Sequence, residues 1–333
     1  METRKLYYED PFQKGFATTV VSCDAVKGGY AVVLAETAFY PEGGGQPYDT
    51  GVLGEANVLE VHEKNGVITH LCDKPLEVGK SVSGKIDWAR RFDHMQQHSG
   101  EHICSGLICE RFHCDNVGFH MGADVVTIDF NADISWDELM EIEQLANLYI
   151  YEDHPIDIQF YRGAELDKVD YRSKKPLEGD VRIVSFSGAD CCACCGTHVV
   201  RSGQVGLVKF LSVQKFRDGV RIELLSGKRA HRYLSECWAQ DVRIAQALSV
   251  KPNASFAGVE RVLAELSALK QRCAKLEESV FAQTAAQYEG KGDVLLFEDE
   301  MSGDSLRKLC DAVTNHCGGR CAVFAVADGA YKF

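Results

Sequence analysis

The chain has 333 residues, of which 45% are hydrophobic, and a net charge of −13. This length allows two or three domains with cores of their own. No apolar run approaches the roughly 20 residues of a membrane helix, and the N-terminus lacks the apolar core of a signal peptide. We therefore expect no membrane partner and a cytoplasmic location. The 14 cysteines do not indicate a disulfide framework, because a chain this long can form a core without one.

Residues 1–88 are predicted to form a small β-barrel. Apolar runs at 18–21 and 30–34 are separated by glycine-containing turns, as expected of short strands. Asn65-Gly66 between Val61-His62 and Val67-Ile68 is a strong hairpin signal, because both turn positions need a positive φ.

Residues 89–230 are predicted to form an α+β domain with a mostly antiparallel sheet. Helical spacing of apolar residues predicts a helix over 93–111. Ser135 and Glu138 form a capping-box pattern that predicts a second helix, ending near 151. Strands are predicted at 125–130, 155–160, 181–186, 205–211 and 220–225.

Residues 231–288 are predicted to be helical, and 289–333 to form a partial α/β domain of strand (294–297), helix (305–316) and strand (322–327). Apolar residues at alternating steps of three and four form a heptad seam in the helix: Val259, Val262, Leu266, Leu269, Cys273, Leu276 and Val280. This seam fits either a coiled coil or an amphipathic helix that packs on its own domain.

Two short motifs carry metal-binding residues. His98 and His102 are four residues apart, so on a helix both imidazoles lie on one face. Cys194 and His198 repeat that spacing downstream, and together the four form a nitrogen and sulfur set that suits Zn²⁺. The spacing leaves open whether Cys194 or Cys195 is the ligand, and Cys191 with Cys194 could form a zinc knuckle.

The first motif also fits H-x-x-E-H, the inverted metallopeptidase signature, with Glu101 as the general base. Cys194 and His198 then have no role. Glu101 is alternatively a solvent-facing helix residue. A third class, a zinc module that binds RNA without catalysis, also fits the ligand set.

A glycine-rich loop, Tyr40-Pro41-Glu42-Gly43-Gly44-Gly45-Gln46-Pro47, brings backbone amides close to any bound anion or sugar. This loop, the histidine pair and Cys194-Cys195-Gly196-Thr197-His198 together resemble the editing domain of alanyl-tRNA synthetase. The resemblance is strongest to the free-standing alanyl-tRNA editing proteins known as AlaX, in their long form. It covers about residues 5–230.

The resemblance implies hydrolysis, without ATP, of serine, or glycine, wrongly esterified to tRNA(Ala). It implies that Zn²⁺ is held by His98, His102, Cys194 and His198. It places substrate-binding groups at Gly43, Gly44, Gly45 and Gln46, and recognition of the serine hydroxyl at Thr37. Asn116 stands where the synthetase has a glutamine.

The charge distribution supplies candidate tRNA contacts. Residues 101–150 contain ten acidic residues and one arginine, whereas residues 201–250 contain nine basic and four acidic residues. A local basic surface can bind phosphates even on an acidic chain. The candidates are Lys209, Lys215, Arg217, Arg221, Lys228 and Arg229, with Lys174 and Lys175 as weaker ones. The tail resembles that of long-form AlaX, which implies a role in tRNA binding or in a homodimer through the 256–284 helix.

Overall fold

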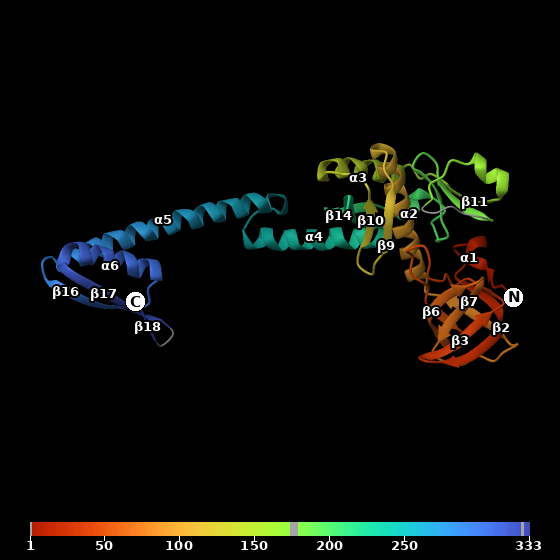
Figure 1. Ribbon diagram of the computed structural model, residues 1–333, viewed down its shortest axis with the longest axis horizontal. Coiled ribbons are helices and arrows are strands. Elements are labelled where there is room, and N and C mark those ends of the chain that lie inside the picture. Colours follow the sequence, from red (N-terminus) through yellow and green to blue (C-terminus); the bar gives the residue numbers. More distant parts are fainter. Residues whose placement is uncertain (1, 174–178, 328–329) are drawn as a thin grey trace. The chain divides into compact units, whose positions relative to one another are not determined.

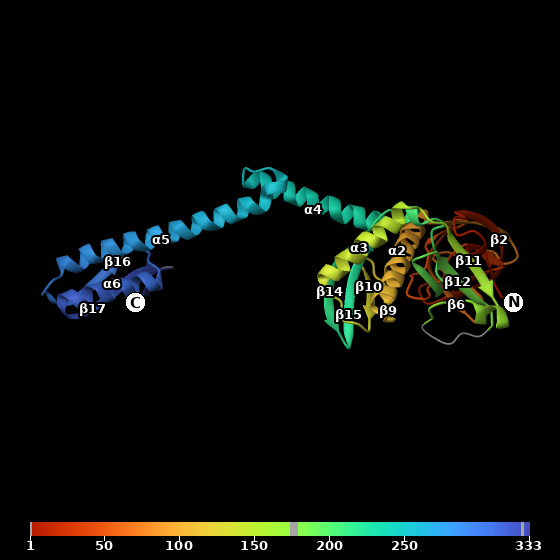
Figure 2. The same cartoon turned by 90° about the horizontal axis from the view of Figure 1, so that it is seen from above.

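The computed structural model describes residues 2–173, 179–327 and 330–333, which form helices and mostly antiparallel strands (Figures 1 and 2). The predicted α+β class is therefore confirmed. Contacts divide the chain into two units, one ending at Glu236 and the other beginning at Cys237. The two predicted domains of residues 1–88 and 89–230 both lie in the first unit.

Six antiparallel strands of the N-terminal region close into a barrel with its own apolar core. The predicted hairpin is present, with φ of 51° at Asn65 and 78° at Gly66. The positive φ at both positions matches the right-handed twist of the flanking strands. In barrel order the strands are β2 (Gly15–Val26), β3 (Gly29–Leu34), β7 (Val67–Cys72), β6 (Ala56–Lys64), β5 (Gly51–Leu53) and β8 (Ser81–Ile86).

The long helix α2 (Trp88–Phe112) follows the barrel and packs beside α3 (Trp136–Tyr151) against a four-stranded antiparallel sheet. Helix α2 begins earlier than predicted, because the Asp87 side chain accepts a hydrogen bond from Arg90 N and caps the helix. The predicted capping box of Ser135 and Glu138 is present at α3. The sheet order is β14 (Val208–Phe216), β15 (Gly219–Ser226), β10 (Val126–Phe130) and β9 (Asn116–Met121).

A second sheet brings the downstream metal-binding motif to α2. It consists of β11 (Ile156–Tyr161), β12 (Val181–Phe186) and β13 (Asp190–Ala193), all antiparallel. A Cβ on Gly106 of α2 would lie 2.0 Å from Ala189 O, so only glycine permits this approach. The remaining short elements of this unit are β1 (Arg4–Lys5), α1 (Leu6–Glu9), β4 (Glu36–Thr37), η1 (Gly163–Lys168) and η2 (Ser202–Val205).

The predicted helical segment 231–288 contains two helices with a break between them. Helix α4 (Gly227–Ala247) contains the boundary between the units, and α5 (Ser255–Gln287) follows the short η3 (Pro252–Ala254). Ser249 has a φ of 55°, and Pro252 disfavours a helical conformation at the residue before it. No helix among the described residues is long and apolar enough to span a membrane.

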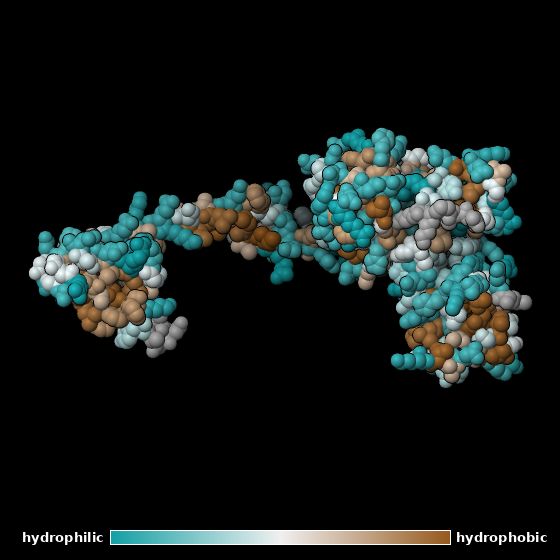
Figure 3. Space-filling model, viewed as in Figure 1, coloured by the Kyte–Doolittle hydropathy of each residue, from teal (hydrophilic) through white to brown (hydrophobic). Residues whose placement is uncertain are grey.

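The C-terminal part of the second unit contains the predicted βαβ arrangement. Strands β16 (Gly292–Glu298) and β17 (Gly318–Ala327) are parallel and joined by α6 (Gly303–Cys317), and β18 (Ala330–Lys332) adds antiparallel to β17. Phe281 and Ala285, near the end of α5, are buried against this core. The heptad seam on α5 is exposed, with apolar residues from 37% exposed at Val259 to 58% at Leu276, and Figure 3 shows apolar side chains gathered there.

Candidate metal centre

Helix α2 places His98 and His102 on one face. Both side chains are almost fully buried, and their ring centroids lie 5.2 Å apart. They lie in the part of α2 that faces the second sheet and the segment that follows it. The spacing predicted from the sequence therefore brings two imidazoles together in the interior.

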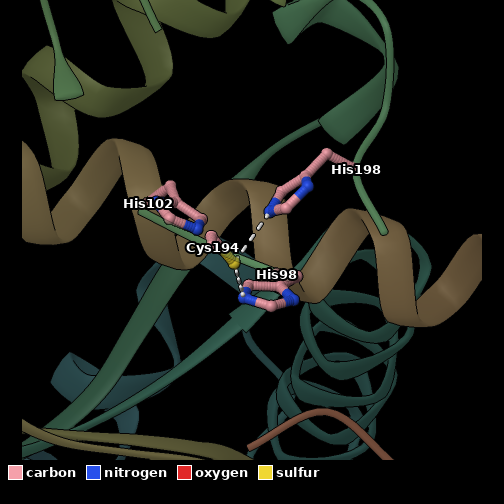
Figure 4. A group of neighbouring side chains, drawn as sticks. All are labelled: His98, His102, Cys194 and His198. Carbon is pink, nitrogen blue, oxygen red and sulfur yellow. Dashed lines mark hydrogen bonds between the residues drawn. The ribbon is translucent and has the colours of Figure 1, made fainter. Parts of the chain in front are cut away.

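Cys194 and His198 approach these imidazoles from the segment after β13. The Cys194 Sγ lies 3.4 Å from His98 Nε2 and 3.7 Å from His198 Nε2. One ligand atom from each of the four residues lies within 4.8 Å of every other. The four side chains point toward one another (Figure 4). The structure thus brings together the four residues named from the sequence.

The charges in this cluster suit a cation. Burial raises the pKa of the Cys194 thiol, but His98 and His198 outweigh burial and hold that pKa well below its usual range. Burial lowers the pKa of His102, yet Asp190 and Cys194 reverse the effect and raise it well above its usual value. The negative groups that favour a proton on His102 equally favour a metal ion.

Two hydrogen bonds from outside the cluster orient its histidines. His98 Nδ1 lies 2.8 Å from Gln46 Oε1, and His102 Nδ1 lies 2.7 Å from Asp190 Oδ2. With Nδ1 donating, Nε2 of each ring is left as a ligand atom, and such outer partners are typical of metal-binding histidines. The buried Nε2 of His102 has no partner among the described residues. The donor set therefore fits a tetrahedral Zn²⁺.

Asp190 is itself held by Arg172. The guanidinium donates to both carboxylate oxygens, at 2.7 and 2.8 Å. Asp190 and Arg172 were not predicted from the sequence, because neither belongs to a ligand spacing. The one signal was the position of Asp190, four residues before Cys194.

A cavity of about 310 Å³ opens beside the cluster, with His98, His102 and Cys194 in its wall. Glu101 also lines it and is 5% exposed, so the alternative of a solvent-facing helix residue is wrong. Its Oε1 accepts from Ser105 Oγ at 2.6 Å and from Asn116 Nδ2 at 2.8 Å. The other lining residues are Gly44, Asn116, Phe119, Arg172, Ser173, Cys192, Ala193 and Cys195.

The sequence matches known proteins over most of its length. It is 31% identical to the alanyl-tRNA editing protein AlaX-L of Pyrococcus horikoshii, over 90% of this chain and 75% of that protein. It is 30% identical to the alanyl-tRNA editing protein Aarsd1-A of Xenopus laevis, over 85% of this chain and 73% of that protein. The chain belongs to the alanyl-tRNA editing family.

The same chain also matches parts of longer enzymes. It is 35% identical to the alanine–tRNA ligase of Pyrococcus abyssi over 93% of this chain, but it spans only 36% of that protein's length. Residues 12–90 match the family described as class II (A) tRNA synthetases, and residues 181–223 match the second additional domain of threonyl and alanyl tRNA synthetases.

The residues of the glycine-rich loop have different roles. Gly44 lines the cavity, as predicted for a substrate-binding residue, and Gly43 closes a turn with Gln46 by two backbone hydrogen bonds. A Cβ on Gly45 would lie 2.6 Å from Phe119 Cδ1, so Gly45 allows the loop to pack on β9. Gln46 is fully buried and bonds His98 and Thr197, so it supports the metal cluster and is not part of the cavity wall.

Thr37, like Gly43, Gly45 and Gln46, is a predicted residue that does not line this cavity. It lies in the barrel core, where its Oγ1 is 2.9 Å from His70 Nε2 and accepts from Phe39 N. Asn116, by contrast, lines the cavity, and its Oδ1 is buried without a partner among the described residues. Of the alternative thiols, Cys195 faces Tyr40, and the four-residue cluster contains Cys194.

The predicted basic surface is largely offset by acidic neighbours. The acidic segment 101–150 contains α3 and β10, which pack beside β14 and β15 from the basic segment. As a result, salt bridges pair Lys209 with Glu143, Lys215 with Asp133 and Arg221 with Asp129. Arg229, on α4, pairs with Asp93 of α2. Arg217 stacks on Phe216. Lys174 and Lys175 lie outside the described residues.

Proposed function

We propose that this protein hydrolyses serine, or glycine, from mischarged tRNA(Ala) in the cytoplasm. The cluster of His98, His102, Cys194 and His198 beside a cavity carries the proposal. The names of the editing relatives supply the substrate class. The cavity of about 310 Å³ suits a small ligand such as an aminoacyl group with part of its nucleoside.

We propose Zn²⁺ as the metal, because a thiolate and three imidazoles are ligands that it prefers. When bound, the ion supplies Lewis acidity that polarises an ester carbonyl or a water molecule. An aminoacyl ester is activated, so the remaining demand is positioning and stabilisation of charge.

Glu101 is the proposed group that holds and deprotonates water. It lies on α2 between two ligands of the cluster and lines the same cavity. The hydrogen bonds from Ser105 and Asn116 hold one carboxylate oxygen in place. A carboxylate within reach of the attacking water is what general-base catalysis requires.

Asn116 is the proposed group that distinguishes serine from alanine. Its Nδ2 is used by Glu101 and Ser105, which leaves the buried Oδ1 as an acceptor in the cavity wall. A serine hydroxyl would satisfy this oxygen, whereas alanine would leave it unpaired. A site built on such a hydrogen bond rejects the analogue that lacks it.

We further propose that the exposed seam of α5 forms a homodimer interface. Six of its apolar residues are more than a third exposed within one chain: Val259, Val262, Leu266, Leu269, Leu276 and Val280. A strip of this kind at heptad spacing is typical of helices that pair.

The proposed activity is tested by release of labelled serine from Ser-tRNA(Ala), with Ala-tRNA(Ala) and a chelator-treated sample beside it. Metal-dependent loss of serine with alanine spared is the expected result. Absence of hydrolysis with metal bound would refute the proposal and favour a zinc module that binds RNA. Peptide hydrolysis that persists in Cys194→Ala would instead favour the H-x-x-E-H peptidase.

A further inference from the structure

A second cavity, of about 420 Å³, lies in the first unit one helical turn along α2 from the metal cavity. His94 lines it and His98 lines the metal cavity, which separates these positions by about 6 Å along the helix axis. The glycine-rich loop also borders both, through Pro47 and Gly44 respectively. The two cavity walls are therefore adjacent both along α2 and along the glycine-rich loop.

The wall of this second cavity has an excess of positive charge. Four cationic side chains, Arg90, Lys228, Arg229 and Arg232, line it with one acidic side chain, Asp93. Asp93 pairs with Arg229, which donates to both of its carboxylate oxygens. The remaining three cations are not balanced by the wall itself, in contrast to the paired residues of β14 and β15.

Two of these cations lie where they oppose helix stability. Lys228 and Arg229 are in the first turn of α4, which has no acidic residue, and Arg232 follows in the second turn. Cations at a helix N-terminus are unfavourable because the helix dipole is positive there. The salt bridge of Arg232 with Glu236, at 3.9 Å and largely exposed, offsets little of this cost. A bound anion in the cavity would interact favourably both with these cations and with the N-terminus of α4.

His94 adds a polar group that has no partner. Its side chain is 2% exposed, it lines the cavity, and its Nδ1 is buried with no hydrogen bond to the described residues. Burial, reinforced by neighbouring cations that include Arg90 and Arg229, lowers the pKa of His94 to about 3. The neutral ring can donate one N–H to an oxygen of a bound anion. Buried polar groups of this kind are normally satisfied, which points to a missing ligand.

We propose that this second cavity binds backbone phosphate of the single-stranded 3′ end of the RNA whose terminal ester lies in the metal cavity. The inference rests on the proposed function for the identity of the strand. Lys228 and Arg232 are four residues apart on α4 and would contact the phosphates together. His94 would contact them from the same cavity wall. The cavity would thereby fix the direction in which the strand enters.

The test uses an unacylated, fluorescently labelled RNA tetranucleotide that ends in CCA, and the same probe with uncharged methylphosphonate linkages. Anisotropy is measured over a salt series for the full chain and for Lys228→Ala/Arg232→Ala. The control Lys215→Ala/Arg217→Ala removes the same charge from β14 and its turn, which the sequence had suggested as the contact. Thermal melting checks that both double variants are folded.

The wild-type protein is expected to prefer the phosphodiester probe. Loss of two phosphate contacts should reduce the slope of log affinity against log salt by about 1.4, which is about 25-fold in affinity between 1 M and 0.1 M salt. An unchanged slope in Lys228→Ala/Arg232→Ala, or an equal loss in the control, would overturn the proposal. Because the probe has no amino acid, phosphate-dependent binding in a protein that fails to deacylate would support this site while refuting the proposed function.

Discussion

Replacement of Gln46 by methionine should weaken metal binding although Gln46 is not a ligand. The Gln46 side chain makes three buried hydrogen bonds: its Oε1 accepts from His98 Nδ1 at 2.8 Å and from Thr197 N at 3.1 Å, and its Nε2 donates to Thr197 Oγ1 at 2.9 Å. Methionine has a similar volume and keeps none of them. His98 would lose the bond that fixes its ring.

The expected size follows from these bonds. Loss of an outer hydrogen-bond partner of a metal-binding histidine costs about 10- to 100-fold in metal affinity, or about 1.4 to 2.8 kcal/mol. Thr197 is 1% exposed, so its unpaired backbone N–H should destabilise the fold by about 1 to 3 kcal/mol. The matched control is Gln46→Glu, which retains the acceptor for His98 and for Thr197 N.

The assay is competition for Zn²⁺ between the protein and a chromophoric chelator at equilibrium, with circular dichroism to verify folding. Gln46→Met should bind Zn²⁺ 10- to 100-fold more weakly than the wild type, and Gln46→Glu should stay within about threefold of it. A folded Gln46→Met protein with wild-type affinity would refute the role assigned to Gln46.

Three further outcomes are expected. Glu101→Gln should retain Zn²⁺ but lower kcat for deacylation by about 10² to 10⁴, and wild-type turnover would contradict the general-base assignment. Burial lowers the pKa of His70 to about 4 from 6.5, so the unfolded chain binds this proton first and stability falls as the pH drops below 6.5. Urea unfolding should show that the free energy of unfolding of the wild type falls by about 2 kcal/mol from pH 7 to 5, and that His70→Gln lacks this loss. The same pH dependence in both proteins would exclude the role of His70. Leu266→Lys should convert a dimer to a monomer in sedimentation without loss of helicity, whereas an unchanged mass would rule out the α5 interface.

The sequence alone determined the local elements and the ligand set. Helical spacing placed His98 and His102 on one face. The same spacing indicated His198 with a nearby thiol, and the family resemblance assigned that thiol to Cys194. The Asn65-Gly66 turn and the Ser135 capping box were also predictable, because each depends on residues that are close along the chain. The break at Ser249 was missed because the apolar pattern continues on both sides of it.

Only the tertiary structure decided which side chains surround those ligands. Gln46 reaches His98 from the glycine-rich loop, 52 residues earlier in the chain, and Gly196 permits this because a Cβ there would lie 2.2 Å from His98 Cε1. Glu101 is buried because Ser105 and Asn116 fold over it. The basic residues of β14 and β15 do not form the predicted basic surface, because acidic partners that are distant along the chain pack beside them. Such contacts depend on how elements approach in space, which residue spacing does not encode.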